Sequence, residues 1–383
     1  MPGISRRGLL MDQKRMIDEF VELVSIETYS LKERAIADVL KKKLTDLGLT
    51  VSEDNAGEIL GGNTGNVYAI LPATTEGEPV LFSCHMDRVP NNGHITPVIN
   101  EEEGIIYSDK KTILAGDDIG GVTAILAMLR EVVEQKIPHG DIEIGFSICE
   151  EVGVSGSALY DFSKFKSKSA FVYDSTGKAG TITLSAPSKG KVTIKVHGKT
   201  SHAGLAPEKG VNAVKIAADL ITRLPDGRIS PQTTANFSML SAGSATNVVC
   251  DLVTITGEQR SRDAGEYKEV SDKIYAAAKA TSEKFGYPID VDIKTQYHAF
   301  SLTETDRPSV LAAEACRRVG IEPFFKQGGG GMDANHFNEH GIQAVGIGTG
   351  NYNCHTSEEY QVIADMVACA KEAVEIVKIA AGN

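Results

Sequence analysis

The sequence has few cysteines and no positively charged cluster, and each lack narrows the range of functions. None of the six cysteines in 383 residues forms a CxxC pair, so no disulfide framework is expected and a reducing compartment is favoured. No cluster of lysine and arginine stands out, and the net charge is −12, which argues against nucleic acid or an anionic membrane as a partner. No apolar stretch is long enough to span a membrane.

The N-terminus lacks most features of an export signal. Ser5-Arg6-Arg7 weakly resembles a twin-arginine signal, but the charged segment Asp12-Gln13-Lys14-Arg15 follows it where such a signal has an apolar region. We therefore predict a cytoplasmic protein.

The first half of the chain alternates between strand and helix patterns. A capping-box pattern, Ser30-Leu31-Lys32-Glu33, predicts the start of a helix that ends near Leu47, and a second helix is predicted from about 119 to 135. This alternation predicts an α/β fold with a helix-covered, mostly parallel sheet. Apolar runs predict its first strands at residues 66–71, 79–84, 141–149 and 170–173.

The pattern changes in the middle of the chain. Residues 185–298 show alternating strands and two helices, which predict an inserted α+β domain. The following residues return to the first pattern, with an apolar strand at 343–348 and a closing helix at about 357–380. Residues 1–184 and 299–383 are therefore predicted to form one discontinuous catalytic domain.

Three of the predicted strands are followed by side chains of the types that commonly bind metals. His85 follows one strand, and Asp87 stands two residues further on, where its carboxylate can receive the second ring N–H of the histidine. Glu150 and Glu151 follow another strand, and Asp174 follows a third. Ligands of open α/β sheets bind beyond the carboxyl ends of the strands, so these side chains predict a metal site.

Glu150 and Glu151 are adjacent, and adjacent side chains leaving a strand point to different sides. One carboxylate can then bind metal while the other stays free as a general base. A solvated loop would explain one glutamate at this place, but the pair favours function.

Two further segments complete the candidate site. The turn Ala115–Gly121 contains Asp117 and Asp118. Either one of them caps the following helix, or one carboxylate bridges two metal ions between small neighbours. His355 follows the last strand of the sheet; a lone loop histidine is usually a surface residue, and only its place beyond a strand of this sheet favours a ligand.

Histidines and carboxylates together suit Zn²⁺, with Mn²⁺ or Co²⁺ as substitutes. Three ligating carboxylates carry about −3 against +4 from two zinc ions, so a bound hydroxide nearly neutralises the site, and two metals are favoured over one. Cys84, Cys149 and Cys354 each precede a proposed site residue. Thiolate ligation is an alternative there, but small buried residues packing under the site are favoured.

With these residues the chain resembles the two-zinc exopeptidases and amidohydrolases that include peptidase T, carboxypeptidase G and aminoacylase. The ordered set HxD, GDD, EE, D and H carries the resemblance over nearly the whole chain. It implies that Asp117 bridges the two zinc ions and that the Asp117–Asp118 peptide is cis. It also implies that Glu150 is the general base and that Asp87 orients a histidine. The implied zinc ligands are His85, Asp117 and Asp174 for one ion and Asp117, Glu151 and His355 for the other.

The resemblance also implies roles outside the zinc ligands. The insert would be a lid and dimerisation domain, whose His202 polarises the scissile carbonyl in a neighbouring subunit's site. Asn247 and Arg260 would bind the substrate carboxylate, and Gly330 and Gly331 would line the substrate. By themselves, His202 is a turn residue, Arg260 a surface arginine and the glycines a flexible loop.

The expected function is zinc-dependent hydrolysis of small peptides by a homodimer, as a peptidase T-like tripeptide aminopeptidase. The sequence departs from peptidase T at Ile119, where a lysine is usual, and at Ala203, where a proline is common. An N-acyl-amino-acid amidohydrolase or a carboxypeptidase of the same family is therefore the alternative. A catalytically inactive binding protein is not favoured, because every ligand and the base are present.

Overall fold

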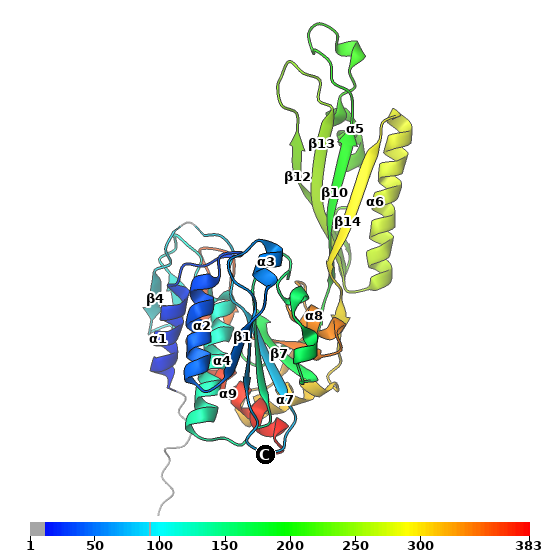
Figure 1. The fold of residues 1–383 in the computed structure, drawn as a ribbon. Helices are drawn as coiled ribbons and strands as arrows, with labels where there is room; N and C mark the ends of the chain where they lie inside the picture. The colour runs from blue at the N-terminus through cyan, green and yellow to red at the C-terminus, as the bar shows by residue number, and fades with distance from the viewer. Residues whose placement is uncertain (1–11, 92) are drawn as a thin grey trace, which may run out of the picture. The chain divides into compact units, whose positions relative to one another are not determined.

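The computed structural model describes residues 12–91 and 93–383, so the Ser5-Arg6-Arg7 pattern lies outside the described residues. The chain divides into two compact units (Figure 1). The larger unit runs to Ser185 and resumes at Ser301, and the smaller unit is the insert Ala186–Phe300. Among the described residues, no helix combines the length and the apolarity needed to cross a bilayer.

The larger unit is built on one mixed sheet, which has eight strands among the described residues. Its central strands are parallel, because β3 pairs in parallel with β6 and β7, and β7 with β17. The predicted mostly parallel sheet is thus confirmed. In spatial order the strands are β1 (Thr50–Glu53), β2 (Val67–Leu71), β6 (Ile142–Ser147), β3 (Val80–His85), β7 (Ser169–Ser175), β17 (Gln343–Gly348), β8 (Thr181–Thr183) and β16 (Phe324–Lys326).

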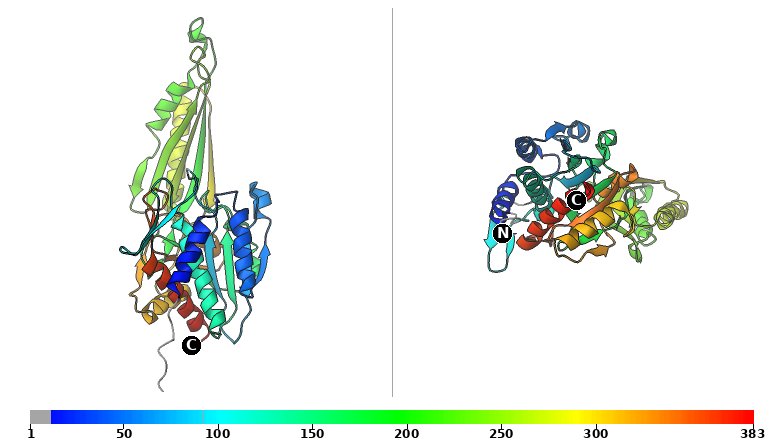
Figure 2. Two further views of the ribbon diagram at one scale, coloured as in Figure 1. Left: turned by 90° about the vertical axis from the view of Figure 1, so that its left-hand side faces the viewer. Right: turned by 90° about the horizontal axis from the view of Figure 1, so that it is seen from below.

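Helices bury their apolar faces against this sheet in a single core cluster. Every residue of β3 and β6 is buried, as expected for strands covered on both faces. In Figure 2, α9 lies beside α4, and the two helices contact each other. The helices that contribute to the cluster are α1 (Gln13–Val24), α2 (Arg34–Asp46), α3 (Ala56–Leu60), α4 (Gly116–Glu134), α7 (Arg307–Arg318) and α9 (Ile363–Ala380).

Two helix starts predicted from the sequence are wrong. Helix α2 begins at Arg34 with no side-chain cap, so the predicted capping box at Ser30 is wrong. Helix α9 begins at Ile363, not near 357, because Tyr360–Val362 forms the short strand β19. β19 joins a small sheet that, in the described part of the chain, also contains β18 (Asn351–Tyr352), β5 (Ile105–Ser108) and β4 (Pro97–Asn100).

Aromatic rings form a second packed group in the larger unit. The rings of Tyr160 and Phe337 stack with their centroids 5.9 Å apart, and Phe337 belongs to the short helix α8 (Ala334–Glu339). The ring of Tyr68, on β2, packs edge-on against Phe165. The group therefore joins the sheet to the segment that follows β6.

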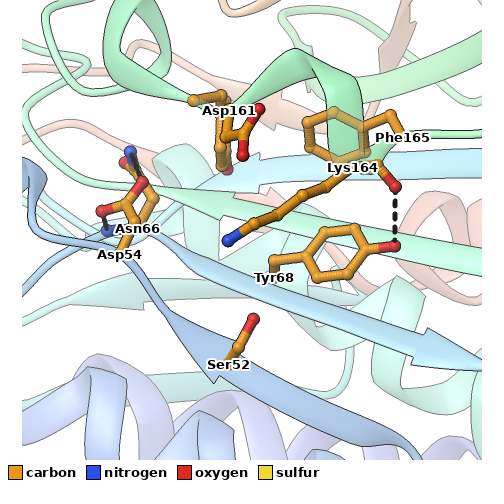
Figure 3. A pocket seen from close by; sticks show the side chains of 8 residues that line it. Ser52, Asp54, Asn66, Tyr68, Asp161, Lys164 and Phe165 are labelled. Carbon is orange, nitrogen blue, oxygen red and sulfur yellow. Dashed lines mark hydrogen bonds between the residues drawn. The ribbon is translucent and has the colours of Figure 1, made fainter.

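A small cleft beside this aromatic group is too small for a substrate (Figure 3). Its volume is about 10 Å³, which is room for about one water molecule. The Tyr68 hydroxyl donates to the Lys164 carbonyl oxygen across it at 3.3 Å, and the Asn66 side chain donates to Asp54 at 2.8 Å.

The inserted unit is an antiparallel sheet packed on two helices, as the α+β prediction required. Along β10, buried residues alternate with more exposed ones, the pattern of a strand with one covered face. Its own core cluster joins the sheet to both helices. The strands lie in the order β11 (Gly227–Ser230), β12 (Thr233–Ala242), β13 (Leu252–Ser261), β10 (Ser188–His197) and β14 (Ile289–Tyr297), and the helices are α5 (Ala213–Ile221) and α6 (Ala264–Phe285).

Candidate metal centre

The sheet brings the predicted metal ligands to one edge. His85 is the last residue of β3, Asp174 is the last but one of β7, and Glu151 follows the end of β6. Because β6, β3 and β7 are neighbouring parallel strands, their carboxyl ends meet at the same edge. His355 joins them from the loop between β18 and β19.

Two groups of side chains at this edge could each hold a metal ion, with their ligand atoms within 4.8 Å of one another. We call His85, Asp117 and Asp174 the inner group, and Asp117, Glu151 and His355 the outer group. In the inner group, His85 Nε2 lies 3.1 Å from Asp117 Oδ1 and 3.8 Å from Asp174 Oδ1. In the outer group, His355 Nε2 lies 3.3 Å from Asp117 Oδ2 and 2.9 Å from Glu151 Oε1.

Asp117 belongs to both groups and presents a different oxygen to each. Its peptide bond to Asp118 is cis, as predicted. The backbone of α4 is non-helical at Asp117 and Asp118, and both Asp117 oxygens lie against histidine nitrogens instead of capping the helix. Gly116 is required here, because a Cβ atom on it would lie 2.3 Å from Nδ2 of Asn351. The geometry is that of a carboxylate placed to bridge two ions.

Glu359 holds the Asp117 turn, a role that was not predicted from the sequence. Its side chain is 1% exposed. One oxygen accepts hydrogen bonds from the backbone N–H groups of Leu114 and Ala115, and the other accepts from Asp117 N–H and the Asn351 amide. The only available signal was its place as the second of two adjacent glutamates just after His355.

Asp87 contacts both His85 and the glutamate pair. His85 Nδ1 lies 2.9 Å from the Asp87 backbone carbonyl oxygen and 3.5 Å from its carboxylate, so the carbonyl is the nearer acceptor. The two carboxylate oxygens accept the backbone N–H groups of Glu150 and Glu151. The predicted orienting role therefore falls mainly to the main chain of Asp87, and its carboxylate fixes the turn that carries the glutamates.

The concentrated negative charge shifts the titration of these groups. Burial, together with neighbouring carboxylates, raises the pKa of Glu150 well above its usual range, and the pKa of Asp174 likewise. Burial also raises the pKa of Asp117, but the bonds from His355 and His85 outweigh it and hold that pKa below its usual range. The bonds to Asp117 and Glu151 raise the pKa of His355 to about 10.

These donors fit a pair of divalent cations. Imidazole nitrogens and carboxylate oxygens are the ligand types that zinc and manganese accept, and cations would offset the mutual repulsion of the carboxylates. Neither group of described residues contains a cysteine. The thiol of Cys84 instead lies buried, 3.8 Å from the Tyr173 carbonyl oxygen.

Three predicted site residues, His202, Asn247 and Arg260, lie in the inserted unit. The His202 ring is exposed, and its Nδ1 accepts the N–H groups of Gly204 and Leu205. The next N–H, of Ala203, donates to the Asn247 carbonyl oxygen at 2.9 Å, which brings those two segments together.

Arg260 and the glycine pair lie in different surroundings. On β13, Arg260 Nε donates to Glu258 on the same strand at 2.7 Å. In the larger unit, Gly330 is exposed with open space where a side chain would be. Gly331 directly precedes the buried residues Met332 and Asp333.

Comparison with known proteins gives matches along nearly the whole chain. The family described as "Peptidase family M28" matches residues 66–213, and the "Peptidase dimerisation domain" matches residues 187–285. Protein YqjE of Bacillus subtilis, which is uncharacterized, is 36% identical over 373 residues, 97% of this chain and 100% of that protein. Peptidase T of Serratia proteamaculans is 26% identical over 399 residues, 92% of this chain and 95% of that protein.

Solved structures also match nearly the whole chain. The crystal structure of aminopeptidase PepT from Bacillus cereus has a TM-score of 0.87 and 36% identity, over 98% of this chain and 100% of that chain. A tripeptidase from Staphylococcus aureus has a TM-score of 0.91 and 32% identity, over 97% and 99%. The chain belongs to the peptidase T family. Membership confirms the predicted resemblance, the α/β fold with an inserted domain, and the prediction of a metallopeptidase.

Proposed function

We propose that this member of the peptidase T family is a two-zinc aminopeptidase that removes the N-terminal residue from tripeptides. The observation that carries the proposal is the pair of ligand groups sharing Asp117, in a chain 36% and 32% identical to an aminopeptidase and a tripeptidase. In the proposal, His85, Asp117 and Asp174 hold one zinc ion, and Asp117, Glu151 and His355 hold the other. When bound, two such ions polarise a carbonyl group and lower the pKa of water toward 7.

Glu150 is proposed as the general base. It lies in the same turn as Glu151 but belongs to neither ligand group, so its carboxylate is not committed to an ion. Its raised pKa suits a group that takes a proton from water and returns it to the leaving amine. Asp87 supports this role by accepting the Glu150 backbone N–H at 2.9 Å.

His202 is proposed to donate a hydrogen bond to the scissile carbonyl oxygen in the partner subunit's site. Two backbone N–H groups donate to its Nδ1, so in the neutral ring the proton resides on Nε2. That tautomer presents a donor to a developing oxyanion, an interaction worth about 3–4 kcal/mol.

Asn247 and Arg260 are proposed to bind the carboxylate of the substrate, for which a guanidinium is suited. Arg260 is now paired with Glu258, so a substrate carboxylate would compete with that pairing. Gly330 and Gly331 are proposed to line the substrate, and the open space at Gly330 leaves room for it.

We also propose a cytoplasmic homodimer that forms through the inserted domain. The match to a peptidase dimerisation domain supports the dimer. All six cysteines are free, which fits a reducing compartment.

The test is hydrolysis of unblocked trialanine by the zinc-loaded protein, with a chelator-treated sample and N-acetyl-trialanine as controls. Release of free alanine that the chelator abolishes and N-acetylation blocks is expected. Cleavage of the blocked peptide alone would replace the proposal with an N-acyl amidohydrolase or carboxypeptidase.

The base is tested separately with Glu150→Gln. This variant should keep both zinc ions and lose about 10²–10⁴-fold in kcat, the usual contribution of a general base. Near-normal turnover in Glu150→Gln would refute the assignment.

A further inference from the structure

The segment between α1 and α2, Ser25–Glu33, contacts both turns that follow β3 and β6. We infer that Glu33 and Ser30 in this segment are positioning residues, which hold the Glu150–Glu151 turn in place for metal binding and catalysis. Hydrogen bonds to the turn support its fixation by these residues. The expected effect of a displaced turn on zinc binding and catalysis rests on the proposed function.

Three consecutive backbone N–H groups in the turn donate to two buried carboxylates. Cys149 N–H donates to Glu33 Oε1 at 3.1 Å. Glu150 N–H and Glu151 N–H donate to the two carboxylate oxygens of Asp87, at 2.9 and 3.2 Å. Glu33 is 0% exposed and Asp87 is 1% exposed, so water does not compete for these bonds.

Ser30 links the two carboxylates into one assembly. Its hydroxyl donates to Asp87 Oδ2 at 2.6 Å, the same oxygen that accepts Glu151 N–H. One residue on, Leu31 N–H donates to Glu33 Oε1 at 2.9 Å, beside the bond from Cys149. Of the two residues that look like a helix cap in the sequence, Glu33 therefore bonds to the Glu150–Glu151 turn directly, at Cys149, and Ser30 bonds to it through Asp87.

Arg88 forms hydrogen bonds to the first part of the segment and to the end of α1. Its guanidinium is 3% exposed. It donates to the backbone carbonyl oxygens of Thr28 at 2.6 Å and Val24 at 2.9 Å, and also to that of Ile26. Because Arg88 directly follows Asp87, the chain just beyond β3 holds the segment at several points, and Cys149, beyond β6, holds its Glu33 end.

The turn needs such support. Cys149 has a φ of 53°, a left-handed conformation that a residue with a Cβ atom rarely adopts. Two adjacent glutamates and Asp87 also bring like charges together. Partners behind the ligands fix ligand orientation, and their loss typically weakens metal affinity or activity by about 10–100-fold.

The main test compares Glu33→Ala with Glu143→Ala. Glu143 is the matched control: it is also 0% exposed and accepts the N–H groups of Lys166 and Ser167, but contacts no ligand group. In zinc titrations of the metal-free proteins, the ion of the outer group, which contains Glu151, should bind about 10–100-fold more weakly to Glu33→Ala. The ion of the inner group should bind with little change. Glu143→Ala should bind both ions as the parent chain does.

Two milder variants separate positioning from folding. Glu33→Gln keeps an oxygen acceptor for Cys149 N–H and should restore most of the lost zinc affinity, whereas Ser30→Ala should lose part of it. Equal weakening of both ions in Glu33→Ala, or the same loss in Glu143→Ala, would overturn the inference.

Hydrogen exchange tests whether Glu33 holds the turn, and it needs neither bound metal nor enzymatic activity. In the metal-free protein, the amides of residues 149–151 should exchange at least about tenfold faster in Glu33→Ala than in Glu143→Ala. Absence of zinc binding or peptidase activity in the parent chain would reject the proposed function. Unchanged exchange at 149–151 in Glu33→Ala would reject the positioning role instead.

Discussion

The two halves of the metal centre are built in different ways. In the inner group, His85 and Asp174 lie on neighbouring strands of the sheet, and the His85 side chain is 1% exposed. In the outer group, Glu151 and His355 lie on loops, and the His355 side chain is 48% exposed. Strand pairing fixes the first set of ligands, so something else must fix the loops that carry the second.

Buried carboxylates that accept backbone N–H groups replace the strands in the outer group. Glu359 binds the Asp117 turn, and Asp87 with Glu33 binds the turn that contains Glu151. All three acceptors are buried, so water does not compete for these bonds. The comparison teaches that the loops carrying candidate ligands depend on residues outside both ligand groups.

The largest effect is expected at Asp117, where the two halves meet. Asp117→Ala removes an oxygen from each group, so both zinc ions should be lost and peptide turnover should fall by more than about 10⁴-fold. Zinc content after dialysis and trialanine hydrolysis measure this. Asp46→Ala, at an exposed aspartate of α2, is the control. An Asp117→Ala protein that retains both ions would contradict a shared ligand.

Glu359→Gln should weaken zinc binding by about 10–100-fold. Each Glu359 oxygen accepts two hydrogen bonds, and the amide NH₂ of glutamine would face two donors in place of one oxygen. Zinc affinity by competition with a chelator measures the loss.

The neighbouring residue provides the control. Glu358 is exposed and pairs only at the surface with Lys110, so Glu358→Gln should bind zinc normally. Equal affinities for the Glu358 and Glu359 variants would show that the Asp117 turn does not need its buried acceptor.

Zinc binding should depend on pH beyond the usual range of histidine. In the metal-free protein, Asp117 and Glu151 raise the pKa of His355 to about 10, so the ring is protonated at neutral pH. Metal binds the neutral imidazole and must displace that proton. Affinity of the outer group should therefore rise about tenfold per pH unit between pH 6.5 and 8.5, instead of levelling near 6.5. Zinc titrations across this range, with His355→Ala as reference, measure it; a plateau near pH 7 would contradict the pKa.

The inner group was the easier half to predict from sequence. His85 and Asp174 end apolar runs whose pattern identifies strands, and the rule for carboxyl ends then places them together. The parallel sheet and the inserted domain followed from the same periodicities. The short strands β4, β5, β18 and β19 did not, because segments of two to four residues carry too little pattern.

The supports of the outer group could not be predicted, since they have no local signature. Ser30 and Glu33 have the spacing of a helix cap, yet their partners Asp87 and Cys149 lie 57 and 116 residues away along the chain. Glu359 bonds to a turn more than 240 residues before it. Only the fold reveals such pairs, because tertiary bonds here replace the local bond that the spacing suggested.

The smallest effect is expected on the stability of the metal-free protein when His355 is removed. His355→Ala breaks ion pairs of a half-exposed ring, which solvent screens in part, so it should cost less stability than the loss of the buried His85 ring. His85→Ala should cost about 3 kcal/mol, because it removes the buried ring that faces the carboxylates of Asp117 and Asp174. Urea unfolding of the two metal-free variants measures the difference. Equal losses would show that strand and loop ligands are embedded alike, and the distinction between the two halves would then rest on metal binding alone.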